Sequence, residues 1–121
     1  MYAIEVHDCF EAEHYLRLPD GGAEDQHGHQ WEVVAEVATG ELDVMGTVMD
    51  FHELRRMLQD VLFALHETDL NETGYFSEEN PSAENVAKYI YERLEKKLPE
   101  RVQLSYIRVL EEKGCWAIFR K

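Results

Sequence analysis

Cysteine and proline are scarce in this chain of 121 residues. The two cysteines, Cys9 and Cys115, form no CxxC pair and are too few for a disulfide framework, which excludes a disulfide-stapled domain and a CxxC redox or zinc motif. Each lies in a stretch with strand character, so we expect both thiols to be buried. The three prolines stand singly at positions 19, 81 and 99, which excludes a proline-rich linker and indicates element boundaries.

Long apolar runs and basic residues are also few. A membrane-spanning helix needs roughly 20 consecutive apolar residues, and no stretch approaches that length. The first residues, "MYAIEVHDCF", lack the basic start and the apolar centre of a signal peptide, so we expect a cytoplasmic protein. The 12 basic residues stand against 25 acidic ones, a formal net charge of −13 that opposes binding to nucleic acid and to anionic membranes. A phosphorylated ligand therefore needs a local group of basic side chains, for which Arg17, Arg108 and Lys113 are candidates.

What the chain does contain is the patterning of one globular domain over residues 1–121. Four stretches have the alternation or the β-branched and aromatic content of strands, namely residues 2–18, 31–37, 101–112 and 115–121. The second of these alternates most clearly, with Trp31 and Val33 on the face that we expect to be buried.

Two further stretches have helical periodicity. Apolar side chains recur every three or four positions over residues 50–67 and again over residues 80–98, where Ser82 is the expected N-cap and Glu84 lies in the first turn. The polar residues 68–80 between them predict a loop. The order ββααββ indicates an α+β fold, with one antiparallel sheet carrying both helices on a single face. Such a small sheet leaves edges uncovered, so we expect a homo-oligomer.

The segment "HGH" at residues 27–29 is the first candidate for chemistry. Side chains two apart on an extended segment point the same way, so His27 and His29 can bind one metal ion, while Gly28 allows close approach of the backbone. Two histidines alone are more often surface residues of a polar turn than metal ligands. His14 adds a third imidazole if its strand pairs with this segment, and three histidines with an open fourth position are typical of catalytic zinc.

A cupin is another common setting for histidines spaced in this way. The spacing disfavours it, because only two residues separate His29 from Glu32 where a cupin has three or four. No later glycine-histidine motif of the cupin type follows either.

Six motifs in order give the chain a family resemblance. They are "FEAEH" ending at His14, "HGH" at 27–29, "GTVMDFHEL" at 46–54, "LN" at 70–71, "NPSAENVA" at 80–87 and "VLEE" around Glu111. Together they cover almost the whole chain, which resembles the 6-pyruvoyltetrahydropterin synthase and 6-carboxytetrahydropterin synthase family.

That resemblance implies a tunnelling fold, in which sheets of ββααββ subunits join into a barrel, usually in hexamers built from two trimers. It implies Zn²⁺ held by His14, His27 and His29, and a pterin anchored by the carboxylate of Glu111. The usual substrate is dihydroneopterin triphosphate, and the zinc polarises its side-chain hydroxyls while a base removes a proton. Triphosphate elimination or carbon–carbon cleavage follows, in queuosine, folate or biopterin-like pathways.

The chain departs from the family pattern just before "HGH". Members that make pyruvoyl or carboxy products carry a catalytic cysteine four to six residues before the first histidine, where this chain has Gly21, Gly22 and Ala23. A branch of the family instead has glutamate three residues before it, as Glu24 is here, and the resemblance then implies an aldolase-like product, 6-hydroxymethyl-dihydropterin. A carboxylate near zinc and an apolar pterin can act as the base. The alternative is that Glu24 is one of 25 acidic residues in a solvated loop.

A second departure affects the family's Asp-His pair in a segment like "LDHxxLN". Here "LHETDLN" puts His66 at the aspartate position and Glu67 at the histidine position. Either His66 takes over proton transfer from one residue away, or Glu67 transfers the proton while His66 orients it. The structural alternative is a polar helix end, where histidine interacts favourably with the helix dipole.

These features support a zinc-dependent pterin lyase or synthase, with cleavage to 6-hydroxymethyl-dihydropterin favoured over 6-carboxy or 6-pyruvoyl products. Glu24, His66 and Glu67 are its candidate catalytic residues, and Glu111 is its candidate substrate-binding residue. Loss of the cysteine and of the Asp-His pair supports a different hypothesis, a non-catalytic pterin- or zinc-binding relative. A third is an enzyme of the same scaffold that acts on another pterin or a purine-like substrate.

Overall fold

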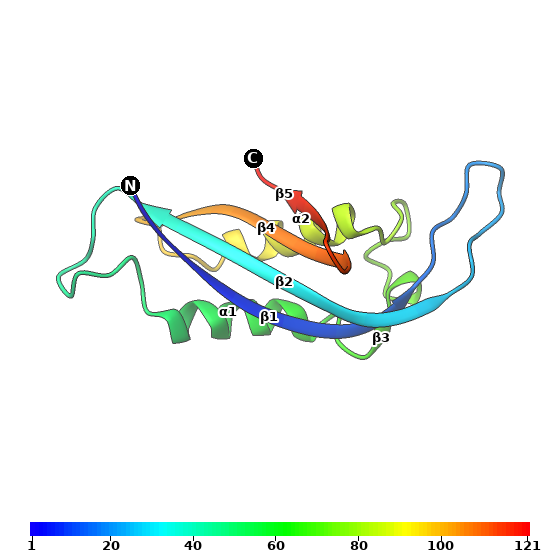
Figure 1. Cartoon of the computed structure of the whole chain (residues 1–121), viewed down its shortest axis with the longest axis horizontal. Helices are drawn as coiled ribbons and strands as arrows, with labels where there is room; N and C mark the ends of the chain where they lie inside the picture. Colours follow the sequence, from blue (N-terminus) through cyan, green and yellow to red (C-terminus); the bar gives the residue numbers. More distant parts are fainter.

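A long β-hairpin forms the centre of the computed structural model, which describes residues 1–121 (Figure 1). Its strands are β1 (Tyr2–His14) and β2 (His27–Thr39), which pair antiparallel along their whole length. Three further strands complete the sheet in the order β3-β1-β2-β4-β5, namely β3 (Thr68–Asp69), β4 (Gln103–Glu112) and β5 (Cys115–Phe119). Only β3 is parallel to its neighbour, and it meets β1 at Ala12 and Glu13.

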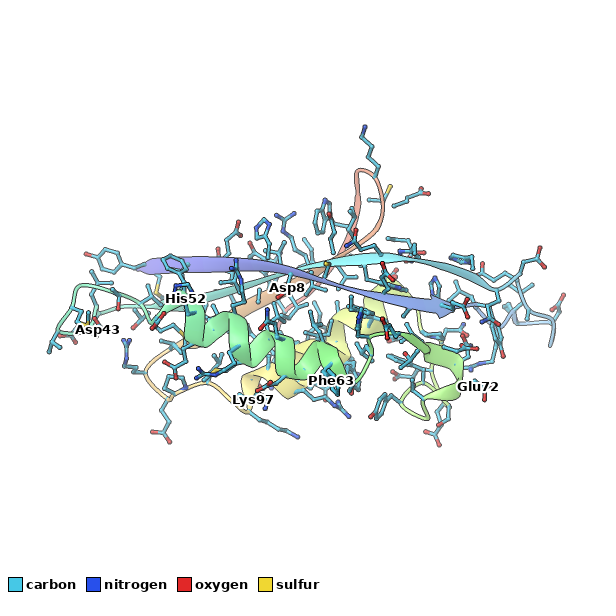
Figure 2. The ribbon with its side chains drawn as sticks, turned by 90° about the horizontal axis from the view of Figure 1, so that it is seen from below. Asp8, Asp43, His52, Phe63, Glu72 and Lys97 are labelled. Carbon is cyan, nitrogen blue, oxygen red and sulfur yellow. The ribbon has the colours of Figure 1, made fainter.

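Two helices cover one face of this sheet, and Figure 2 shows both of them on the same side of the strands. They are α1 (Phe51–Phe63) and α2 (Ala83–Glu95), and a short 3-10 helix, η1 (Leu70–Glu72), follows β3. Ser82 is the N-cap of α2, as the sequence predicts, and accepts a hydrogen bond from the backbone N of Asn85. The predicted α+β class is confirmed. Neither α1 nor α2 has the length and apolar content that crossing a membrane demands.

The core lies between the sheet and the helices, and it extends to the histidines. Alternate residues of β1 face the helices, so the row that begins with buried Val6 and Phe10 ends with His14, of which only 1% is exposed. Trp31 on β2 is fully buried and stacks on Phe10 with ring centroids 5.6 Å apart. Burial of each large apolar side chain contributes about 1.5 to 3 kcal/mol, so the core stabilises the end of the hairpin that carries the histidines.

Several predicted boundaries are wrong in an informative way. The first strand ends at His14 instead of residue 18, and β2 begins at His27, so "HGH" belongs to the strand and does not precede it. The predicted loop 68–80 contains β3 and η1. The first helix ends at Phe63 instead of residue 67, because the chain must turn to join β1 there: Glu67 has a positive φ of 57° and its backbone N donates to the carbonyl of Glu11 at 2.7 Å.

The prediction that both cysteines are buried is also wrong, although both lie on strands. Cys9 and Cys115 are exposed free thiols. Cys9 occupies an odd position of β1, and these positions face away from the helices, while Cys115 is the first residue of β5 at the edge of the sheet. The sequence pattern identified the strands, but it did not show which face of the sheet each cysteine side chain occupies.

Candidate metal centre and its cavity

Strand pairing brings the three predicted histidines together at the end of the hairpin. His14 lies directly opposite His27 in the β1–β2 register, and His29 lies two residues further along the same face of β2. The Nε2 atoms of His14 and His27 are 2.9 Å apart, and the ring centroid of His29 is 5.5 Å from that of His14. The sequence pattern predicted this convergence from the alternation of side chains on a strand.

Backbone carbonyls hold each of the three imidazoles through its other ring nitrogen. The Nδ1 atoms of His14, His27 and His29 lie 2.7, 3.3 and 3.1 Å from the carbonyl oxygens of Pro81, Asp25 and Gln30, respectively. A carbonyl can only accept, so each Nδ1 carries a hydrogen, and in the neutral imidazole each Nε2 then presents a lone pair. Three lone pairs converge with no donor between them, and the buried Nε2 of His29 has no hydrogen-bond partner. This donor set fits a zinc-type cation, which neutral imidazole nitrogens bind at about 2.0 to 2.1 Å.

Glu111, near the end of β4, joins this group. Its Oε1 lies 3.5 Å from Nε2 of His14, and its Oε2 lies 3.8 Å from Nε2 of His29. The four candidate ligand atoms of His14, His27, His29 and Glu111 all lie within 4.8 Å of one another. The carboxylate is therefore close enough to serve as a fourth ligand, and it is also half-exposed and free to turn toward a bound molecule.

The charges of this group shift two pKa values. A hydrogen bond from His14 lowers the pKa of the Glu111 carboxyl below its usual range, against the opposing effect of partial burial. Burial lowers the pKa of His14, but the hydrogen bond to Glu111, the carbonyl of Pro81 and the charge of Glu111 together outweigh it and raise that pKa. Without a metal ion, both shifts favour a protonated His14 beside an ionised Glu111, and a cation bound at Nε2 would take the place of that proton.

A cavity of about 500 Å³ opens onto this group on the helix side of the sheet. His14 and Glu111 lie at one end of it, and apolar side chains, among them Leu16 and Trp116, form its walls. Its remaining lining residues are Ser82, Ala83, Glu84, Cys115 and Ala117. No lysine or arginine lines the cavity, whereas two carboxylates do.

Glu84 is the residue that the sequence analysis missed. It was assigned only to the first turn of the second helix, where a carboxylate stabilises the helix dipole. In the fold, its side chain also lines the cavity that His14 and Glu111 share. The available signal was its position three residues after Pro81, the residue whose carbonyl orients His14.

Glu24 lies close to the histidines, in the segment 15–26 that connects β1 to β2 and that we call the hairpin extension. Its Oε1 accepts a hydrogen bond from the backbone N of Leu16 at 2.9 Å, and its own backbone N donates to the carbonyl of Leu16 at 3.0 Å. Its negative charge is among those that raise the pKa of His14. The side chain is half-buried, so Glu24 is not the fully solvated loop residue that the alternative interpretation describes.

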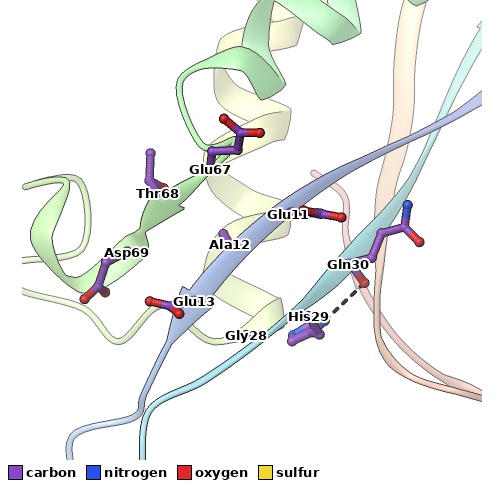
Figure 3. Close-up of a pocket in the computed structure, with 9 residues that line it drawn as sticks. All are labelled: Glu11, Ala12, Glu13, Gly28, His29, Gln30, Glu67, Thr68 and Asp69. Carbon is purple, nitrogen blue, oxygen red and sulfur yellow. Dashed lines mark hydrogen bonds between the residues drawn. The ribbon is translucent and has the colours of Figure 1, made fainter.

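His66 and Glu67 do not join the histidine group within one chain. Nδ1 of His66 accepts from the backbone N of Glu11 at 3.1 Å, and its Nε2 lies 3.5 Å from Oε1 of Glu67. In Figure 3 the whole width of β1 separates Glu67 from His29 on β2, as the strand order requires. Glu67 instead lines a second depression, of about 530 Å³, which His29 also borders from the far side of β1. Three other acidic side chains, Glu11, Glu13 and Asp69, and one apolar residue, Ala12, line it as well. That composition is less suited to a flat aromatic ligand than the cavity beside Trp116.

Comparisons with known proteins agree with this architecture. A family model described as 6-pyruvoyl tetrahydropterin synthase matches residues 3–121. A dihydroneopterin monophosphate aldolase from Pyrococcus furiosus is 36% identical over 104 residues, covering 84% of this chain and 82% of that protein. A 6-pyruvoyl tetrahydrobiopterin synthase from Homo sapiens is 35% identical over 97 residues, covering 78% of this chain and 66% of that protein.

A solved structure shows the same fold. The 6-pyruvoyl tetrahydropterin synthase of Caenorhabditis elegans aligns with a TM-score of 0.84 and 22% sequence identity, covering 99% of this chain and 95% of that one. The match to the family model spans nearly the whole chain, from the first strand to the last. The chain belongs to the 6-pyruvoyl tetrahydropterin synthase family.

Proposed function

We propose that the protein is a zinc-dependent lyase of the pterin synthase and aldolase type, which cleaves the side chain of a dihydroneopterin to 6-hydroxymethyl-dihydropterin. The observation that carries the proposal is the convergence of three Nε2 lone pairs at the end of an apolar-walled cavity, with the carboxylate of Glu24 beside them. The similarity to a dihydroneopterin monophosphate aldolase supports the aldolase choice over pyruvoyl or carboxy products.

In this reaction the three histidines hold the metal ion and Glu24 transfers the proton. When bound by His14, His27 and His29, zinc supplies Lewis acidity toward the side-chain hydroxyls. Glu24 accepts the proton of the hydroxyl on the second side-chain carbon, and the bond from that carbon to the first breaks. The electron pair passes into the conjugated C6–N5 unit of the ring, and the lost fragment, which carries the phosphate, leaves as an aldehyde. The proton that Glu24 accepted then returns to the first side-chain carbon, which restores the C6–N5 double bond and gives the hydroxymethyl product.

Two carboxylates are placed to recognise the pterin. Its amino-pyrimidine edge presents parallel N–H donors, which a carboxylate accepts in a bidentate, charge-assisted pair. Glu111 takes this role in our proposal, and Glu84 is a second acceptor in the same cavity. The indole of Trp116 offers a flat apolar wall for the ring.

The charge of the cavity bears on the phosphate count of the substrate. Glu84 and Glu111 line it and no basic residue does, so a highly charged triphosphate is repelled more strongly than a monophosphate. Of the phosphorylated dihydroneopterins, we therefore propose the monophosphate ahead of the triphosphate. Arg108, one of the candidate phosphate ligands, is placed over the Trp116 ring, with Cζ 4.4 Å from its centroid.

The decisive experiment incubates the zinc-loaded protein with dihydroneopterin monophosphate and, separately, with the triphosphate, and identifies the products by mass. We expect 6-hydroxymethyl-dihydropterin, formed faster from the monophosphate. A 6-carboxy or 6-pyruvoyl product would contradict the aldolase assignment, and faster turnover of the triphosphate would contradict the substrate choice.

Strand β1 lies between Glu67 and the histidines of β2, and neither His66 nor Glu67 belongs to the group of candidate ligands. A second candidate function is therefore a pterin- or zinc-binding protein without catalysis. This candidate predicts stoichiometric pterin binding to the zinc-loaded chain with no product after prolonged incubation. Calorimetry and the mass assay, done on the same sample, distinguish it from the lyase.

We also propose a homo-oligomer, a hexamer built as a dimer of trimers. Two open sheet edges support assembly, because β3 covers β1 only at Ala12 and Glu13 and β5 has no outer neighbour. Trp116 and Ile118 on β5 leave exposed apolar surface near that edge. Light scattering on the purified protein gives the mass, and a monomer at micromolar concentration would contradict the proposal.

A further inference from the structure

Two asparagine side chains take the place of a strand beside the hairpin extension that follows His14. Oδ1 of Asn71 accepts from the backbone N of Tyr15 at 2.9 Å, and its Nδ2 donates to the carbonyl of the same residue at 3.1 Å. Asn80 repeats the arrangement two residues later, accepting from the backbone N of Arg17 at 2.8 Å and donating to its carbonyl at 3.0 Å. Each primary amide thus pairs with a peptide unit as a neighbouring strand would.

This pairing determines which way the residue between them faces. In an extended segment, successive residues direct their N–H and C=O groups to opposite sides. Tyr15 and Arg17 therefore face the two asparagines, and Leu16 faces Glu24. The backbone N of Leu16 donates to the Glu24 carboxylate at 2.9 Å, and its carbonyl accepts from the backbone N of Glu24 at 3.0 Å.

The segment 71–80, which carries the asparagines, is itself held by further hydrogen bonds near its second end. Nη2 of Arg17 donates to the carbonyls of Phe76 and Glu79 at 2.8 and 2.7 Å. These hydrogen bonds tie the hairpin extension to the segment 71–80. The carbonyl of Asn80 accepts from Nδ2 of Asn85 on α2 at 2.9 Å. Packing of α2 on the sheet therefore fixes the position of Asn80.

We propose that Asn71 and Asn80 are positioning residues, whose side-chain amides hold Tyr15 to Arg17 so that the Leu16 N–H places the Glu24 carboxylate beside the three histidines. The inference rests on the proposed function for the role of Glu24 as base, whereas the hold on Leu16 is a property of the fold. Movement of a reacting group by about 1 Å costs about 100-fold in rate, so the amides matter without contacting the substrate.

Nuclear magnetic resonance tests directly whether the two asparagines maintain the hydrogen bond from the Leu16 N–H to Glu24. In the zinc-loaded, ¹⁵N-labelled protein, Glu24→Gln identifies how the Leu16 amide resonance moves when its charged acceptor is lost. We expect Asn71→Ala and Asn80→Ala to move that resonance in the same direction. Should an alanine variant fail to fold, the isosteric Asn71→Asp and Asn80→Asp, which keep the acceptor and lose the donor, give the same reading. An unchanged Leu16 resonance would overturn the inference.

A matched control separates this effect from general destabilisation. The hydroxyl of buried Thr39 donates to the carbonyls of Glu41 and Arg101 at the opposite end of β2. Thr39→Ala removes comparable hydrogen bonds, so we expect it to lower the melting temperature without moving the Leu16 resonance. Movement of that resonance in Thr39→Ala would show that any loss of stability suffices, and would also overturn the inference.

Kinetics then test whether the asparagines act through Glu24. We expect Asn71→Ala to lower kcat about 10- to 100-fold with little change in KM, and to change kcat less than about twofold when Glu24 is already Gln, because groups that act as a unit are not additive. An equal loss in both backgrounds would contradict positioning through Glu24. If Glu24→Gln alone leaves kcat unchanged, the base assignment of the proposed function fails, and the Leu16 resonance still decides the hold.

Discussion

His14 donates its Nδ1 hydrogen to the carbonyl oxygen of Pro81 at 2.7 Å, which directs Nε2 toward His27. Pro81 immediately precedes Ser82, the N-cap of α2, so the start of this helix sets the orientation of an imidazole of the candidate metal centre. The motif "NPSAENVA" thus contributes to the metal centre without supplying a ligand.

Replacement of a histidine in the metal centre should abolish zinc binding. We expect His27→Ala to lose stoichiometric zinc after dialysis against a weak chelator, because two neutral imidazoles bind the ion much less tightly than three. His52→Ala is the matched control, since His52 is exposed on α1 and does not belong to the group of candidate ligands. Elemental analysis gives the ratio, and one zinc per chain retained in His27→Ala would refute the three-histidine site.

The metal-free protein should show a pH-dependent contribution from the pair of His14 and Glu111. The pKa of His14 is raised above 6.5, so its stabilisation is present below that pH and is lost as the pH rises through the folded-state value. The pKa of Glu111 is lowered below 4.5, so its stabilisation is present above that pH and is lost as the pH falls through the folded-state value. We expect the melting temperature of metal-free Glu111→Gln to lie furthest below that of the unaltered protein near pH 5.5. A difference that grows toward pH 8 would contradict the ion pair.

Removal of the Glu24 charge should slow the reaction without releasing the metal. General-base catalysis contributes about 100- to 10,000-fold, so we expect Glu24→Gln to lower kcat by at least 100-fold while zinc stays stoichiometric. Asp25→Asn neutralises the adjacent exposed carboxylate, and Cys115→Ser removes the thiol that lines the cavity; both should keep kcat within about threefold. Loss of activity in Cys115→Ser with none in Glu24→Gln would assign the proton transfer to the thiol.

Neutralising Glu111 should distinguish substrate binding from metal ligation. A hydrogen bond to a charged group contributes about 1.5 to 3 kcal/mol, so we expect Glu111→Gln to raise KM about 10- to 100-fold and to leave zinc bound. Glu84→Gln, at the other carboxylate of the cavity, is the comparison and should raise KM without any change in zinc affinity. Zinc loss in Glu111→Gln comparable to that in His27→Ala would instead make Glu111 a fourth ligand.

Features that depend on short-range pattern were predictable. Spacing of three and four with an N-cap at Ser82 identifies α2, and the two-residue period of a strand is enough to put His27 and His29 on one face. The end of α1 was not predictable from periodicity, because the positive φ of Glu67 arises where the chain meets β1. The burial of cysteine was mispredicted for a related reason, since strand character does not state which face is covered.

The sequence by itself determined the α+β class, the three histidines and the absence of the usual cysteine, because helix period, strand period and motif order are local properties of the chain. Only the tertiary structure decided that Glu84 and Glu111 share one cavity with His14, and that β1 separates His66 and Glu67 from it. These relationships join residues far apart in the chain, and they follow from strand order and from the packing of α2 on the sheet.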